Sequence, residues 1–206
     1  MEITSEDQLL ELLGQPAEAV TAKISNRLNA LTRPLIERAP FLCLATSDAE
    51  GNCDVSPRGD PAGFVRIIDD RTMLIPERPG NKIADSLRNI IANPHVGLLF
   101  IIPGVTDTFR VNGRAVLTTD AALLEASTLE GKTPRLGIVV SIDVAYTQCS
   151  KAFLRSDLWN PAGFVDRSSF ATNGEILRAV RDDPGFDADG YDQARAERYA
   201  RRDGFY

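Results

Sequence analysis

The chain has 206 residues, of which 43% are hydrophobic and 25% are charged, and its formal net charge is −6. These totals predict a globular protein with a real core, built as one domain with terminal additions or as two small domains. The acidic balance without a basic tract argues against a general nucleic-acid-binding protein, and no apolar run is long enough to span a membrane. The acidic stretch at residues 1–7 lacks the basic and apolar regions of a signal peptide, so we expect a cytoplasmic protein.

Few residues suit metal binding or nucleophilic catalysis. The three cysteines, Cys43, Cys53 and Cys149, are too widely spaced for a disulfide framework or a zinc motif. Cys149 is a candidate reactive thiol, although a buried and inert cysteine is the more common case. His95 is the only histidine, which excludes two-histidine metal motifs and disfavours a Ser-His or Cys-His hydrolase. We expect His95 in the core or at a strand end, and we expect no metal site.

The first 40 residues predict helices that pack against the main domain. Ser5 and Gln8 match a capping box, which starts a helix that ends before Gly14. The apolar spacing predicts a second helix over residues 17–31. Pro34 suits the first turn of a third, short helix.

From Phe41 the chain reads mainly as β-structure. We expect strands at residues 41–46, 53–60, 64–68, 72–75, 96–102, 108–118 and 136–148. Asn112-Gly113 lies inside one of these strands and predicts a bulge or a tight bend. One helix is inserted midway and a short one is expected over residues 121–129. This order favours an antiparallel barrel or sandwich over alternating βαβ units.

The inserted helix belongs to the most informative segment, residues 75–94, which predicts a strand end, a turn and a helix with one apolar face. Asn81 suits the N-cap, and Asn93-Pro94 ends the helix. Arg78, Asn81 and Lys82 therefore crowd a helix N-terminus, where free N–H groups and the helix dipole favour an anion. The pattern predicts a phosphate site. The alternative is a capped surface helix whose Arg and Lys side chains face water.

A second polar cluster lies along one predicted strand, at Asp54, Ser56, Arg58 and Asp60. Alternate residues of a strand share one face, so these four side chains should point the same way. Pro57 lacks a backbone donor, which predicts an edge or bent strand. The cluster is either the solvated face of an edge strand or a ligand floor on which Arg58 presents a bidentate guanidinium to a carbonyl or phosphate.

A third cluster follows the last strand, where ligand contacts are common. Gln148 and Lys151 lie where the strand leaves the sheet, and Lys151, Arg155 and Trp159 share one face if the segment is helical. Trp159 either stacks on a planar ring or fills the core. The three clusters could converge on one anionic, planar ligand such as FMN, although the residues alone do not select flavin over another phosphorylated ligand. Beyond them, residues 175–181 suggest a helix, and residues 194–202 suggest a surface helix or a mobile tail.

Six segments resemble, in their order and spacing, the pyridoxamine 5′-phosphate oxidase-like flavoproteins, and in particular a bacterial branch with the Ser-Pro-Arg-Gly-Asp motif. The segments begin at Phe41, Asp54, Arg78, Val96, Val111 and Gln148. The resemblance covers roughly residues 41–161. It implies a mainly β, antiparallel split barrel with flanking helices, a homodimer, and two FMN sites at the subunit interface. The corresponding domains are an N-terminal helical extension (1–40), the FMN-binding split barrel (41–165) and a C-terminal helical extension or tail (166–206).

The resemblance also implies roles for the three clusters. Arg78, Asn81 and Lys82 would hold the FMN phosphate, and Ser56 and Arg58 would lie beside the flavin or its ribityl chain. The residues that then close the site, partly from the partner subunit, are Gln148, Cys149, Lys151, Arg155 and Trp159.

The chain departs from the namesake enzyme, whose substrate site uses an Arg-x-His pattern near the C-terminus, because no histidine follows Gln148. Haem-degrading relatives usually rely on histidine as well. We therefore expect an FMN-dependent oxidoreductase that passes hydride or electrons from a donor such as NAD(P)H to an unknown small acceptor or oxygen, with Arg58 or Lys151 stabilising charge near the reduced ring. The alternatives are a non-catalytic flavin-binding protein, an enzyme that uses the deazaflavin F420, and a structural protein without a cofactor.

Overall fold

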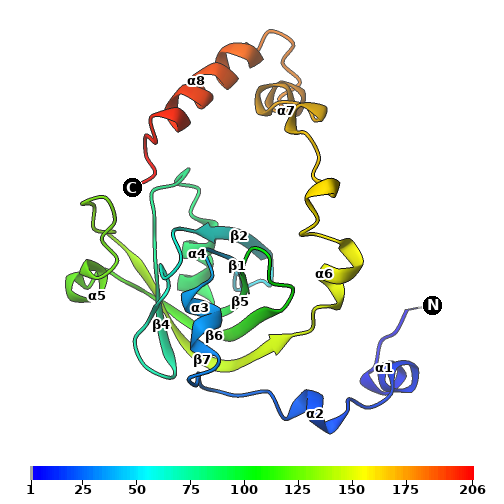
Figure 1. Cartoon of the computed structure of the whole chain (residues 1–206). Helices are drawn as coiled ribbons and strands as arrows, with labels where there is room; N and C mark the ends of the chain where they lie inside the picture. Colours follow the sequence, from blue (N-terminus) through cyan, green and yellow to red (C-terminus); the bar gives the residue numbers. More distant parts are fainter. Residues whose placement is uncertain (1) are drawn as a thin grey trace.

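The centre of the molecule is a seven-stranded antiparallel sheet in the order β2-β1-β5-β6-β7-β4-β3. The computed structural model describes residues 2–206 (Figure 1). The strands are β1 (Phe41–Ser47), β2 (Cys53–Gly59), β3 (Arg66–Ile67), β4 (Thr72–Pro76), β5 (His95–Ile101), β6 (Thr108–Thr118) and β7 (Gly137–Gln148). Together with the flanking helices, this sheet confirms the predicted mainly β, antiparallel split barrel.

Helices precede, interrupt and follow the strands. They are α1 (Glu6–Leu13), α2 (Glu18–Thr21), α3 (Arg33–Glu37), α4 (Asp85–Ala92), α5 (Ala121–Glu125), α6 (Lys151–Ser156), α7 (Asn173–Val180) and α8 (Ala188–Ala200). Helix α4 lies between β4 and β5 in sequence and contacts β1, β2 and β6. Among residues 2–206, none of the helices combines the length and apolar character that crossing a membrane requires.

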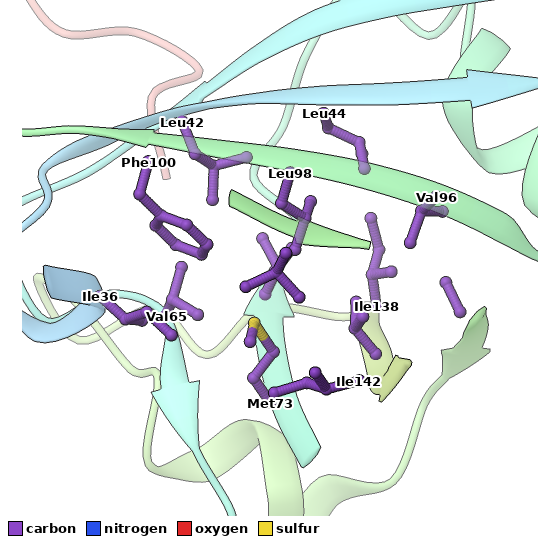
Figure 2. Packing of buried hydrophobic residues seen from close by; sticks show 14 of the residues in the cluster. Ile36, Leu42, Leu44, Val65, Met73, Val96, Leu98, Phe100, Ile138 and Ile142 are labelled. Carbon is purple, nitrogen blue, oxygen red and sulfur yellow. The ribbon is translucent and has the colours of Figure 1, made fainter. Parts of the chain in front are cut away.

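The core lies between the two halves of the curved sheet, as Figure 2 shows. Residues of β1 are buried alternately, and Leu42 and Leu44 are fully buried. They lie on the same side as Phe100 of β5, opposite Met73 of β4 and Ile138 of β7 (Figure 2). Removing this apolar surface from water is the main stabilising contribution to the barrel.

A β-bulge interrupts the pairing of the two longest strands, β6 and β7, between Asn112 and Gly113, as the sequence predicted. A Cβ atom on Gly113 would lie 2.1 Å from the carbonyl oxygen of Ser141, so no side chain fits there. The bulge sharpens the local bend of the strand, which helps the sheet to close.

The helix predicted over residues 17–31 is wrong. Only Glu18–Thr21 is helical, and Ser25 instead forms an isolated bridge with Ala145 of β7. The two backbone hydrogen bonds between them are 3.1 Å and 2.6 Å long. Strand β4 pairs with β7 only as far as Ser141, so the edge beyond that point is open to another segment. A tertiary pairing thus replaced the local helix that the apolar spacing predicted.

The first two helices lie away from the barrel (Figure 1). The predicted start and end of α1 are present: Ser5 accepts from the N–H of Gln8, and Gly14 follows the helix with a φ of 75°. The predicted capping box is incomplete, because the Gln8 side chain accepts from the N–H of Thr4 and not from that of Ser5. However, neither α1 nor α2 buries a residue, so the expected packing of the N-terminal helices against the barrel occurs only at α3, where Ile36 is fully buried.

The C-terminal helices α7 and α8 contact each other. Helix α7 confirms the helix suggested at residues 175–181, and a complete capping box between Thr172 and Glu175 starts it. The charged segment at residues 194–202 is the second half of the longer helix α8. Apolar side chains are exposed on both terminal extensions: Leu13 of α1 is 72% exposed, and Val180 of α7 is 79% exposed.

Candidate functional site

Two of the three polar clusters meet at one cavity of about 680 Å³. Its lining comes mainly from residues 54–60 on β2 and residues 76–87, the segment that leads from β4 into α4. We call it the β2–α4 cavity. The volume is in the range of small-molecule and cofactor sites.

The floor of this cavity is the inner face of β2. Asp54, Ser56 and Arg58 are each half-buried, whereas the residues between them are exposed. The predicted shared face is therefore confirmed, and β2 is an edge strand, as Pro57 indicated.

Arg58 forms an ion pair with Glu77, and both side chains are largely covered, with exposed fractions of 16% and 21%. Burial raises the pKa of the Glu77 carboxyl, and the Arg58 guanidinium opposes that shift. The Nε of Arg58 is buried and has no hydrogen-bond partner among the described residues. A ligand oxygen would satisfy this donor. The sequence analysis missed Glu77, because nothing in its local pattern shows that it lies opposite Arg58.

Arg78 is held by the protein itself. Its Nε donates to Oδ2 of Asp60 at 2.6 Å, and its Nη2 donates to the carbonyl oxygen of Ser127 at 3.0 Å. Helix α5 ends at Glu125, before the predicted residue 129, which leaves this carbonyl outside the helix. The guanidinium also lies 5.3 Å from the centre of the Tyr206 ring. Arg78 therefore lines the cavity as a fixed, neutralised cation.

Helix α4 begins at Asp85, so the prediction of Asn81 as its N-cap is wrong. The side chain of Asn81 accepts from the N–H of Ile83 at 3.0 Å, a local turn that competes with capping. Ala84 occupies the N-cap in a left-handed conformation with φ of 61° and offers no side-chain acceptor. The N–H groups of the first turn therefore have no side-chain cap from the described residues, and residues 84–87 line the cavity. The predicted end of the helix at Asn93 is confirmed.

Lys82 lies in the same loop with φ of 65°, and its side chain is exposed. Among residues 2–206 it has no hydrogen-bond or ion-pair partner for its ammonium group. Lys82 and the start of α4 are thus the positive groups that this cavity leaves available to an anion.

A chain of hydroxyl groups connects α4 to the floor. Ser86 is only 3% exposed, donates to Oδ2 of Asp54 at 2.6 Å, and lies 2.9 Å from the hydroxyl of Ser56. Because Ser86 has one proton and gives it to Asp54, Ser56 must donate to Ser86. The remaining capacity of Ser56 toward the cavity is that of an acceptor. The sequence analysis missed Ser86, because only its position on the polar side of the helix distinguishes it.

The third cluster does not reach this cavity within one chain. Lys151, Arg155 and Cys149 are exposed, so the expectation of a buried Cys149 is wrong. Gln148 donates to the hydroxyl of Tyr146 at 3.3 Å. Trp159 is half-buried outside the core and donates to the carbonyl oxygen of Val105 at 2.9 Å. The alternative in which Trp159 fills the core is therefore also wrong.

His95 is the exposed first residue of β5, which confirms the strand-end alternative. Within residues 2–206, no three His, Cys, Asp or Glu side chains are grouped closely enough to hold a metal ion.

Comparison with known proteins adds the family. The pyridoxamine 5′-phosphate oxidase family matches residues 28–149, which include all seven strands. No curated protein matches the chain. Similar solved structures include HupZ from Group A Streptococcus, at 20% identity over 58% of this chain and 93% of that one, with a TM-score of 0.48. The heme storage protein HutZ from Vibrio cholerae is 18% identical over 59% of this chain and 95% of its own, with a TM-score of 0.41. An FMN-binding protein from Syntrophomonas wolfei is 14% identical over 58% and 89%, with a TM-score of 0.41. Because the family match covers more than half of the sequence, this chain belongs to the pyridoxamine 5′-phosphate oxidase family.

Proposed function

We propose that this protein binds FMN in the β2–α4 cavity and acts as an FMN-dependent oxidoreductase toward a small donor and acceptor. The observation that carries the proposal is the convergence of Lys82, the uncapped start of α4 and the unsatisfied Nε of Arg58 on one cavity. Membership of a flavoprotein family supports it. When bound, FMN supplies the hydride and electron chemistry, and the protein supplies binding and orientation.

The phosphate end would lie against α4. Phosphate oxygens accept from backbone N–H groups at a helix N-terminus and pair with a nearby ammonium group. The first turn of α4 and Lys82 provide both, whereas Arg78 is already neutralised by Asp60. We therefore assign the phosphate mainly to Lys82 and the helix start.

The ring and ribityl chain would lie along β2. The Nε of Arg58 can donate to a ring carbonyl oxygen, and its ion pair with Glu77 holds it in place. Ser56 can accept from a ring N–H or a ribityl hydroxyl, because its own proton is committed to Ser86. Arg58 would thus face a hydrogen-bond acceptor of the ligand, and Ser56 would face a hydrogen-bond donor.

A second subunit would complete the site. Seven charged residues line the cavity, four acidic and three basic: Asp54, Asp60, Glu77, Asp85, Arg58, Arg78 and Lys82. A phosphate monoester carries up to two negative charges, so one chain supplies too little positive charge. We infer a homodimer in which the exposed Lys151 and Arg155 of a partner approach this cavity. The exposed apolar side chains of α1 and α7 support association between copies.

The first experiment is the visible absorption spectrum of the purified protein, with mass spectrometry of the ligand released by heating. A flavin spectrum and the mass of FMN are expected. A colourless protein that also fails to take up added FMN would overturn the proposal. Oxidation of NADPH or NADH with an added acceptor then tests turnover, and sedimentation equilibrium tests the dimer.

The phosphate assignment is tested by Lys82→Ala. We expect FMN affinity to fall on the order of tenfold, as for one lost charge-assisted hydrogen bond. Riboflavin, which lacks the phosphate, should bind the variant and the wild type equally. Arg88→Ala is the matched control, since Arg88 is an exposed cation of α4 outside the cavity lining. An unchanged FMN affinity, or an equal loss for riboflavin, would contradict the assignment.

A further inference from the structure

The chain leaves the barrel at α6 and returns toward it after α8, as Figure 1 shows. Residues 202–206 make the return contact, and we call them the C-terminal strap. Arg202 forms an ion pair with Glu130 at 2.9 Å. The Nζ of Lys132 donates to the backbone oxygen of Tyr206 at 3.0 Å. The strap is thus bound to the segment between α5 and β7, and it brings the Tyr206 side chain to the loop that follows β4.

Tyr206 contacts both members of the Asp60–Arg78 ion pair. Its ring centre lies 5.3 Å from the Arg78 guanidinium. Burial raises the pKa of the Tyr206 hydroxyl, and a hydrogen bond to the Asp60 carboxylate raises it further. The ion pair is covered, since the side chains of Arg78 and Asp60 are 16% and 3% exposed. Water weakens the attraction between two charges, so a ring that keeps water away from this pair strengthens it.

Arg78 in turn anchors the loop between β4 and α4. Its Nε donates to Asp60, and its Nη2 donates to the carbonyl oxygen of Ser127. Within residues 2–206, no other hydrogen bond joins residues 78–83 to a segment outside the loop. The position of the loop therefore depends on this one side chain.

The same loop is strained next to α4. Lys82 and Ala84 both have left-handed backbone conformations, with φ of 65° and 61°. Residues other than glycine hold such conformations only where the surrounding structure fixes them. Lys82 and the uncapped start of α4, to which we assign the phosphate, therefore keep their positions through the anchor at Arg78.

We propose that Tyr206 is a positioning residue for this phosphate-binding loop: by covering the Asp60–Arg78 pair, it fixes Lys82 and the start of α4 in the geometry that receives an anion. Tyr206 does so without lining the β2–α4 cavity itself. The effect on FMN rests on the proposed function, whereas the effect on the loop does not.

The first test measures proton exchange with water by NMR in the ligand-free, full-length protein. The reporters are the Nε–H of Arg78 and the backbone N–H of Ile83, which donates to the side chain of Asn81 at 3.0 Å. Tyr206→Ala should accelerate exchange at both reporters about fivefold, as for the loss of one cation–π contact. Tyr206→Phe should restore most of the protection, because the ring remains.

Two controls separate positioning from a general loss of stability. Phe170→Ala removes an exposed aromatic side chain of the same terminal extension, outside the strap, and should leave both reporters unchanged. The backbone N–H of Val111, a fully buried residue of β6, should exchange at the wild-type rate in every variant.

The second test measures the affinities for FMN and riboflavin by titration calorimetry. Tyr206→Ala should weaken FMN binding about fivefold and leave riboflavin binding unchanged, because only FMN carries the phosphate. Tyr206→Phe and Phe170→Ala should bind both ligands as the wild type does.

The outcomes separate the two proposals. Wild-type exchange rates in Tyr206→Ala would overturn the positioning role and leave the FMN proposal standing. Faster exchange with an unchanged preference for FMN over riboflavin would overturn the connection between Tyr206 and the phosphate. If the wild type binds no FMN, the proposed function fails, and the exchange rates alone decide whether Tyr206 positions the loop.

Discussion

Ser86 donates its hydroxyl proton to the carboxylate of Asp54 at 2.6 Å, and this bond joins helix α4 to the edge strand β2. The same oxygen accepts from Ser56. The nearly buried hydroxyl of Ser86 therefore connects the two walls of the cavity. It donates to Asp54 and accepts from Ser56.

Replacing Ser86 with alanine should therefore destabilise the protein. The change leaves a carboxylate and a hydroxyl without their partner in a largely covered place, which costs about 1–3 kcal/mol. The urea midpoint should fall accordingly. Ser141→Ala is the control, because Ser141 is exposed on β7. Equal midpoints for Ser86→Ala and the control would show that the connection contributes nothing to stability.

Glu77 predicts a specific pH dependence of stability. Burial raises the pKa of its carboxyl in the folded chain above the ordinary value of 4.5, despite the opposing effect of Arg58. A group with a raised folded pKa stabilises the fold below its unfolded pKa, and that contribution is lost as the pH rises through the folded pKa. The urea midpoint of the wild type should therefore fall relative to that of Glu77→Gln as the pH rises from 4.5 through the raised pKa of the folded chain.

The ion pair with Arg58 exists only where Glu77 is ionised, so its effect is already part of this pH dependence. A difference between Glu77→Gln and the wild type that is the same at every pH reflects other effects of the substitution, and the change in the difference with pH is the informative quantity. Glu125→Gln serves as the control at an exposed carboxylate. A difference that grows in favour of the wild type as the pH rises would mean that the ion pair outweighs burial.

The elements that the sequence predicted best are those in which local pattern and tertiary role agree. The alternation of residues 108–118 matches β6 at both ends, because one face of that strand packs in the core. The polar alternation after Asp54 and the position of Pro57 correctly placed β2 at the edge of the sheet. Asn112-Gly113 gave the bulge, since only a glycine fits against Ser141.

The structural details that the sequence did not reveal have both local and long-range causes. Asn81 has the chemistry of an N-cap, but a turn to Ile83 uses its side chain. The phosphate role of Arg78 stays a prediction, and its ion pair with Asp60 is a contact that the local pattern did not indicate. Likewise, the apolar spacing of residues 17–31 did not reveal that an open edge of β7 would pair with Ser25. Local spacing does not specify such long-range pairings.

Gly113→Ala should be strongly destabilising. Its Cβ would lie 2.1 Å from one backbone atom of Ser141 and 3.0 Å from another, so the two central strands must separate. A loss of roughly 3 kcal/mol or more in unfolding free energy is expected for overpacking against the backbone. Gly97→Ala on β5 is the matched control, because its Cβ would meet nothing closer than 3.7 Å. Comparable urea midpoints for the two variants would be inconsistent with the bulge geometry.

Met73 tests whether the stability of the protein comes from the barrel core. It is fully buried, and Figure 2 shows it between Val65 and Ile142. Met73→Ala should leave a cavity and cost about 2–5 kcal/mol, whereas Val116→Ala, on the outer face of β6 at 61% exposure, should cost far less. Neither substitution changes a charged residue, so a comparison of the two variants by urea unfolding isolates the contribution of the core. A small cost at Met73 would mean that the core relaxes around the missing side chain, in disagreement with the dense packing between the two halves of the sheet.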